Sequence, residues 1–119
     1  IPIALTSLGR AYLSALVPTD RQLLMARLAP DYGATWPAVS SAISKSLTQV
    51  RRLGYCWAEW QPGMVAIATP LCEPEGQRYA LNISLPAPTG AAQRLALEHG
   101  ELLMTLAHRI FERWCTLRA

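Results

Sequence analysis

Large and small side chains alternate along three segments between Gly54 and Pro86. The alternation predicts three strands, at Tyr55–Trp60, Met64–Leu71 and Gln77–Leu85, because successive strand side chains point to opposite faces of a sheet. One predicted face carries large side chains: Tyr55, Trp57, Val65, Ile67, Tyr79, Leu81, Ile83 and Leu85. The other carries small ones: Cys56, Ala58, Ala66, Ala68, Ala80, Asn82 and Ser84. If the strands pair as a meander in register, one side of the sheet is built for packing and the other leaves room.

The room over the small face has two interpretations. Alanine on a sheet face is ordinary, so the pattern alone favours a helix that packs closely against it. The second interpretation is a ligand pocket. Asn82 and Ser84 support it, because a buried amide or hydroxyl needs a hydrogen-bonding partner.

Helical periodicity predicts two helices before the sheet. The first runs to about Leu16, the second stops before Pro30, and a loop rich in turn formers covers residues 30–37. Each helix start has short polar side chains that can cap it: Thr6 or Ser7 for the first, and Thr19 or Asp20 for the second.

A third helix is predicted over about 38–53, ending at Gly54, which suits the left-handed conformation of a helix terminus. Turns are expected at residues 61–63 and 73–76, where Pro and Gly cluster. A last helix begins near Thr89 or Gly90. Its predicted apolar stripe is Leu95, Leu102, Leu106, Ile110 and Trp114, widened by Leu103, Ala107 and Phe111, which is wide enough to pack on the sheet and to leave some surface for a partner subunit.

Composition limits the class of protein. The 119 residues suit one domain, and 51% hydrophobic with 16% charged residues argues against disorder. No apolar run reaches the roughly 20 residues that a membrane span needs, and no leader peptide is recognised, so a cytoplasmic location with no membrane partner is expected. The net charge of +3 is weak and its basic residues are scattered, which gives no reason to expect nucleic-acid binding by this domain.

Motifs for catalysis, cofactors or metals are largely absent. The chain has no GxGxxG, GxxxxGK[ST], HExxH or GxSxG motif, and its three cysteines are widely spaced. His99 and His108 lie nine residues apart in one predicted helix, on opposite sides of it. We therefore expect no catalytic residue, no cofactor and no metal. Glu59, beside two tryptophans, is the one candidate general base, although a solvated charge at a strand end is the better interpretation.

The helix start at Thr6-Ser7-Leu8-Gly9 has a more specific meaning. A helix N-terminus presents unpaired backbone N–H groups at the positive end of the helix dipole, which suits a carboxylate or another anion. A plain helix cap is the simpler interpretation of the same residues. The anion site gains weight if this helix end faces the small side of the sheet.

Three segments in fixed order resemble the effector-binding domain of the IclR family of bacterial transcription regulators: TSLGRAYLSAL, RRLGYCWAEW and PGMVAIATPLCEPEGQRYALNIS, followed by a long terminal helix. The family counterparts read approximately TALGKALLA, RGYAVD and PGVRCIAAPVFDADGRVVAALSVSGP. The resemblance covers nearly the whole chain, and the combination is far more specific than any single segment.

This resemblance implies an α/β (α+β) fold with a GAF-like antiparallel sheet flanked by helices. It implies a domain over 1–119 that senses a small molecule, often an organic or aromatic acid, and that assembles into a homodimer or tetramer. Operator DNA would be bound by a separate N-terminal winged helix-turn-helix, and neither that part nor the first strands of the sensor domain are present in this sequence.

Seven residues are the candidate effector-binding positions that the resemblance implies: Ser7, Leu8, Ala58, Glu59, Ala66, Asn82 and Ser84. The family's ligand-facing amides and paired polar strand positions fall on Ser7, Leu8, Asn82 and Ser84, and Glu59 lies on the other face of its strand. An acidic family position falls on Ala58, with Glu59 next to it, and a family cysteine falls on Ala66. These departures suggest an effector that is larger or more apolar than a small keto acid. Two alternatives remain open: a small α/β enzyme that uses Glu59 as its base, and a domain that has lost its ligand and only assembles subunits.

Overall fold

Three antiparallel strands form one sheet in the order β1-β2-β3. The computed structural model describes residues 2–118, without the side chain of Arg118. The strands are β1 (Cys56–Ala58), β2 (Met64–Cys72) and β3 (Arg78–Pro86), so the predicted meander is confirmed. Strand β1 is shorter than predicted, because the chain leaves the ladder after Ala58 and enters the turn before β2.

In the register of the sheet, small residues pair with small ones and large residues pair with large ones. Small residues pair across the strands, Ala58 with Ala66 and Ala66 with Ser84, and large ones pair as Trp57 with Ile67 and Ile67 with Ile83. This confirms the two faces predicted from the alternation. The pairing places Ala58, Ala66 and Ser84 in one row across all three strands.

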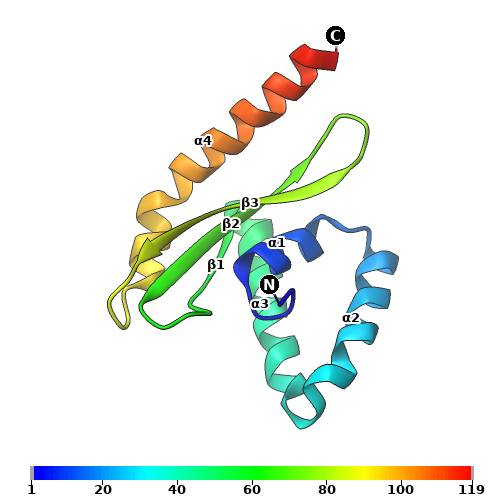
Figure 1. The fold of residues 1–119 in the computed structure, drawn as a ribbon, viewed down its shortest axis with the longest axis vertical. Coiled ribbons are helices and arrows are strands. Elements are labelled where there is room, and N and C mark those ends of the chain that lie inside the picture. Colours follow the sequence, from blue (N-terminus) through cyan, green and yellow to red (C-terminus); the bar gives the residue numbers. More distant parts are fainter. Residues whose placement is uncertain (1, 119) are drawn as a thin grey trace.

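Helix α4 (Ala92–Arg118) covers the large face of the sheet (Figure 1). Its buried contacts with Tyr55 and Ile67 come from Ala96 and Leu103, so the predicted packing on the sheet is confirmed. The predicted stripe is wrong in detail, since Leu102 is 55% exposed and the buried positions are Ala96, Gly100, Leu103 and Ala107. The close approach of the helix explains this: a Cβ at Gly100 would lie 2.1 Å from the Tyr55 ring, so small residues must face the strands.

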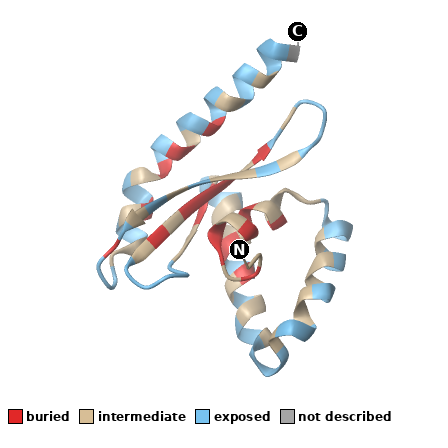
Figure 2. Cartoon of the chain, in the orientation of Figure 1, coloured by how far each residue is buried: buried red, intermediate tan, exposed pale blue. Residues whose placement is uncertain are grey.

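Helices α1 (Ser7–Ala15) and α3 (Trp36–Leu53) lie on the small face. Ala11 of α1 packs on Cys56 and Ala68 of the sheet, with Val50 of α3 alongside. The closely packed helix is therefore the right interpretation for the middle of this face. Figure 2 shows the buried residues concentrated on β2, α1 and the inner side of α4.

Helix α2 (Pro18–Tyr32) contradicts two predictions. It begins at Pro18 after Val17, without a side-chain cap, and it continues through Pro30. The predicted loop over 30–37 is wrong too, because α2 is followed by a single 3-10 turn (Gly33–Thr35) and then directly by α3. Packing outweighs the local cost of Pro30 near a helix end. Side chains of α2 pack on a cluster formed with α1 and α3: Leu24, Met25, Leu28 and Tyr32.

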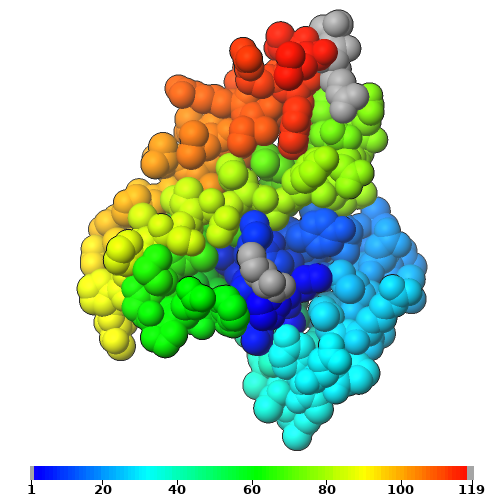
Figure 3. Space-filling view, viewed as in Figure 1, coloured from blue at the N-terminus to red at the C-terminus, as the bar shows by residue number. Residues whose placement is uncertain are grey.

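Two predicted turn features are confirmed. Gly54 ends α3 with φ of 92°, and its N–H donates to the Val50 carbonyl oxygen over 2.8 Å. The β2–β3 hairpin closes through the Glu73 N–H and the Gln77 carbonyl oxygen, with Gly76 at φ of 95°. The molecule measures 49 × 36 × 23 Å, with α4 and the hairpin at one end and the α2–α3 pair at the other (Figure 3). Within residues 2–118 no helix is both long and apolar enough to cross a membrane.

Candidate functional site

The first turn of α1 is held in place by the segment before it. The Thr6 hydroxyl oxygen caps the helix by accepting from the Gly9 N–H at 3.1 Å, and the same hydroxyl donates to the Pro2 carbonyl oxygen at 2.9 Å. Gly9 is required because a Cβ there would lie 2.3 Å from the Ile3 carbonyl oxygen. The glycine thus lets the chain before the helix lie directly against it.

Among residues 2–118, two backbone N–H groups and one hydroxyl have no hydrogen-bonding partner at this helix start. The first helical hydrogen bond runs from the Arg10 N–H to the Thr6 carbonyl oxygen, so the N–H groups of Ser7 and Leu8 have no partner inside the helix. The Ser7 side chain is fully buried, and its Oγ has no hydrogen-bonding partner. An unpaired buried hydroxyl costs free energy, which indicates a partner that the chain itself does not supply.

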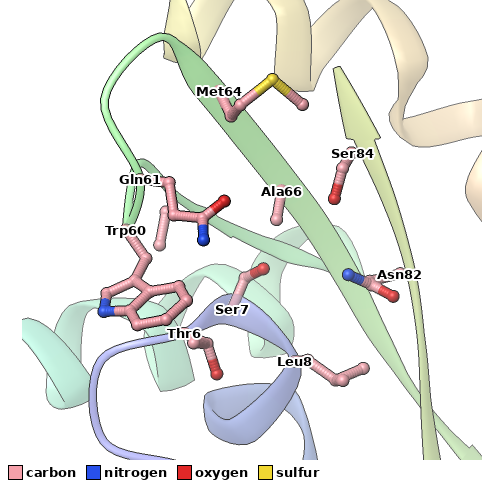
Figure 4. A pocket seen from close by; sticks show the side chains of 10 residues that line it. Thr6, Ser7, Leu8, Trp60, Gln61, Met64, Ala66, Asn82 and Ser84 are labelled. Atoms are coloured by element: carbon pink, nitrogen blue, oxygen red, sulfur yellow. The ribbon is translucent and has the colours of Figure 1, made fainter. Parts of the chain in front are cut away.

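A cavity of about 310 Å³ lies in front of this helix start, between α1 and the small face of the sheet. Ten residues line it: Thr6, Ser7, Leu8, Ala58, Trp60, Gln61, Met64, Ala66, Asn82 and Ser84. In Figure 4 the Ser7 hydroxyl points into the space, with the Asn82 amide and the Ser84 hydroxyl on one side and Trp60 and Gln61 on the other. The small face therefore holds both a packed helix, at its centre, and a pocket, beyond the helix start.

Six of the seven predicted site residues lie together on this cavity: Ser7, Leu8, Ala58, Ala66, Asn82 and Ser84. The structure does not bring Glu59 to it, because Glu59 is exposed and follows Ala58 at the end of β1. Ala58 and Ala66 are paired neighbours in the ladder, and their short side chains leave the space open.

Four lining residues were missed from the sequence: Thr6, Trp60, Gln61 and Met64. Alternation along β2 places Met64 on the same face as Ala66, so this residue could have been found. Trp60 could have been found as well, because alternation along the predicted strand Tyr55–Trp60 places it on the same face as Cys56 and Ala58. Gln61 could not, since it was assigned to a plain turn.

The electrostatics of the cavity suit an anion held by neutral donors. None of the ten lining residues carries a charge at neutral pH. The nearby Arg10 guanidinium donates from Nε to the Ala4 carbonyl oxygen at 2.9 Å and from Nη1 to Ser46 Oγ at 3.3 Å. Burial lowers the pKa of Arg10. The Ser7 and Leu8 N–H groups, the helix dipole and the Ser7 hydroxyl can together bind a carboxylate.

Cys56 lies behind this helix start as a buried free thiol. Burial raises its pKa to about 12, against a smaller opposite effect of the Arg10 charge. The thiol is therefore protonated at neutral pH and is a poor nucleophile. Among the described residues, no group of three or more His, Cys, Asp or Glu side chains is placed to hold a metal ion.

No family model matches the sequence, and no curated protein matches it either. Solved structures do match. An IclR family transcriptional regulator from Brucella abortus superposes with a TM-score of 0.87 at 23% identity, over 95% of this chain and 44% of that chain.

Two further structures extend the comparison. The inducer-binding domain of the PobR transcription factor from Acinetobacter, a double mutant in complex with 3-hydroxybenzoic acid, has a TM-score of 0.68 at 26% identity, over 93% of this chain and 68% of that chain. The C-terminal domain of the transcriptional regulator KdgR from E. coli has a TM-score of 0.71 at 23% identity, over 95% of this chain and 71% of that chain.

This chain thus spans less than half of the Brucella regulator. The fold predicted from the resemblance, an antiparallel sheet flanked by helices, is confirmed by these superpositions. The chain has the fold of the C-terminal effector-binding domain of IclR-family transcriptional regulators.

Proposed function

We propose that this chain is the small-molecule effector-sensing and oligomerisation domain of a bacterial, cytoplasmic IclR-type transcriptional regulator. One observation carries the proposal: the unpaired, fully buried Ser7 hydroxyl and the free N–H groups of α1 face a cavity whose other wall bears Asn82 and Ser84. A core that only packed helices would not leave these donors without partners.

The effector that fits is an organic acid with one carboxylate. Its carboxylate oxygens would accept from the Ser7 and Leu8 N–H groups, and Asn82 and Ser84 would hydrogen-bond the rest of the molecule. Ala58 and Ala66 open the floor of the cavity, which supports an acid larger or more apolar than a small keto acid. A structural neighbour, the PobR inducer-binding domain, holds 3-hydroxybenzoic acid.

Signalling in this proposal needs no catalysis. An acid bound between the start of α1 and strand β3 stabilises one arrangement of these elements, and it shifts the equilibrium between subunit arrangements only as far as it binds them unequally. Glu59 is exposed and is not among the residues that line the cavity, so the cavity gives no support to the alternative of an enzyme with Glu59 as base.

The whole regulator would bind operator DNA through an N-terminal winged helix-turn-helix outside this sequence. Coverage of only 44% of the Brucella regulator supports further domains in the whole protein. The outer edge of β3 has no partner strand among residues 2–118, which supports additional strands of the sensor sheet in the same protein.

Helix α4 is our proposed surface for assembly with a second copy. The turn of about 100° per residue places five apolar residues along one side of this helix: Leu95, Leu102, Leu106, Ile110 and Leu117. Three of them are exposed, by 55% at Leu102, 37% at Leu106 and 74% at Leu117.

The charges along α4 favour an antiparallel pair of helices. Before Leu106 the helix carries Arg94, Glu98 and Glu101, which is one net negative charge. After Leu106 it carries Arg109, Glu112, Arg113 and Arg118, which is a net charge of +2. Two α4 helices crossing at Leu106 in antiparallel fashion would bring the acidic half of one against the basic half of the other, and a parallel pair would oppose like charges.

Calorimetric titration of the 119-residue chain tests the sensor function. We expect benzoate and hydroxybenzoates to bind to the wild type, and the double substitution Asn82→Val and Ser84→Val to abolish both binding and ligand-induced thermal stabilisation. Thr48→Val, at a partly buried position on α3, is the control and should leave binding unchanged. Tight binding of glyoxylate or pyruvate alone would contradict the larger effector, and failure of every acid to bind would favour the assembly-only alternative.

A further inference from the structure

Trp60 differs from the other three tryptophans of the chain. Trp36, Trp57 and Trp114 each lie beside a tyrosine ring, with centroid distances of 6.1, 6.4 and 5.6 Å. Trp60 has no such ring neighbour among residues 2–118, belongs to none of the hydrophobic clusters and is 44% exposed. An indole is a large apolar group, and core packing does not explain why that of Trp60 is partly exposed at this position.

The backbone holds Trp60 over the cavity. After β1 ends at Ala58, the chain turns through Gln61, whose carbonyl oxygen accepts from the Met64 N–H at 3.1 Å. The Gly63 carbonyl oxygen accepts from the Ala87 N–H at 2.8 Å, which ties the far side of the turn to the end of β3. The turn is thus anchored beyond Trp60, while the indole projects beside the Ser7 side of the cavity (Figure 4).

The cavity consequently has two chemically different sides next to the Ser7 hydroxyl. The polar side consists of the α1 N–H groups, the Ser7 hydroxyl and the Asn82 amide. The apolar surface across from Asn82 is the exposed indole of Trp60, with the Gln61 amide beside it, whereas Met64 and Leu8 line other parts of the cavity. A flat ring attached to a carboxylate satisfies both sides at once, since its acid group can bind at Ser7 while its ring stacks on the indole. An acid such as pyruvate reaches only the polar side.

We infer that Trp60 is the specificity-determining residue of this site, selecting aromatic monocarboxylic acids over small aliphatic ones by stacking on their ring. The inference rests on the proposed function, because it concerns the same cavity.

Calorimetry with benzoate and pyruvate on the wild type, Trp60→Ala and Trp60→Phe tests it. We expect Trp60→Ala to weaken benzoate binding by about tenfold, the loss expected for stacking together with ring burial. Trp60→Phe should keep most of the affinity for benzoate. Pyruvate binding should be weak in the wild type and the same in all three proteins. Trp36→Phe, far from the cavity and paired with Tyr32, is the matched control and should change neither affinity.

The outcomes separate the two proposals. If benzoate binds and Trp60→Ala leaves its affinity unchanged, or if Trp60→Ala weakens benzoate and pyruvate equally, the role of Trp60 is overturned and the sensor function stands. If pyruvate binds and benzoate does not, the role of Trp60 is likewise overturned and the sensor function stands. If neither acid binds to the wild type, both proposals are overturned. Melting temperatures of the variants check that each is folded, and the partial exposure of Trp60 leads us to expect little change.

Discussion

The Cys56 thiol lies 3.5 Å from the Ser7 carbonyl oxygen and donates to it, which joins β1 to the first turn of α1. Both residues are fully buried, and Ser7 also presents its hydroxyl to the cavity. The same short segment of α1 is therefore packed against the sheet on one side and faces the candidate ligand site on the other. A ligand at Ser7 would act directly on the contact between this helix and the sheet.

This contact gives the chain a predicted dependence on alkaline pH. Burial raises the pKa of Cys56 from 9.0 to about 12 in the folded chain, so the folded state holds the thiol proton more tightly than the unfolded state does. Its contribution to the free energy of unfolding is fully present below about pH 9 and is lost as the pH rises toward about 12. Urea denaturation at about pH 8 and about pH 10.5 measures this loss.

Cys56→Ala should show a smaller loss of stability between the two pH values than the wild type, because it has no thiol to ionise. Cys72→Ala is the control, since Cys72 is exposed, and it should behave as the wild type. Equal pH dependence in all three proteins would contradict the prediction.

Replacing Ser7 by Ala should have opposite effects on stability and on binding. The substitution removes a buried hydroxyl without a partner, so the ligand-free chain should gain about 1 kcal/mol in the free energy of unfolding. Binding of benzoate should weaken, because one donor to the carboxylate is lost.

Ser46→Ala is the matched control for Ser7→Ala. Ser46 is 2% exposed and accepts from the Arg10 guanidinium, so its removal should destabilise the chain by about 1 kcal/mol. Thermal melts of the two variants test whether Ser7→Ala raises the stability and Ser46→Ala lowers it. A loss of stability in Ser7→Ala would show that its hydroxyl already has a partner.

Gly9→Ala should disrupt the start of α1. Its Cβ would lie 2.3 Å from the Ile3 carbonyl oxygen, a backbone atom that cannot move without displacing the segment before the helix. We expect a loss of about 2–3 kcal/mol and weaker acid binding. The control is Gly76→Ala, whose Cβ would contact nothing within 4 Å and which should lose only about 1 kcal/mol through its φ of 95°. Similar losses in chemical denaturation of both variants would contradict the close packing at Gly9.

Leu106→Glu should reduce self-association of the chain. Leu106 lies in the middle of the exposed apolar side of α4, and a carboxylate there would be desolvated when two helices pack. Sedimentation velocity should show a shift toward the monomer. Thr105→Glu, exposed and on another side of the helix, should assemble as the wild type does. A wild-type chain that is monomeric at all concentrations would rule out this surface.

The sequence by itself determined the sheet and its two faces. Alternation is a local property of the backbone, so Ala66 and its neighbours on β1 and β3 could be assigned to one face without knowing what lies above it. The positive φ angles of Gly54 and Gly76 could also be predicted from the sequence, because glycine itself permits this backbone conformation. Six residues that line the cavity were predicted from the family motifs.

The tertiary structure decided what packs on each face and where the chain bends. Pro30 remains helical because partly buried side chains of α2 pack on a cluster formed with α1 and α3. The small residues of α4 face the sheet because the Tyr55 ring lies where a Cβ at Gly100 would be. Gln61 lines the cavity because the chain leaves the ladder after Ala58 and turns back toward β2. Each of these outcomes depends on contacts between residues far apart in the chain, whose free energies exceed the local preferences that a sequence pattern reports.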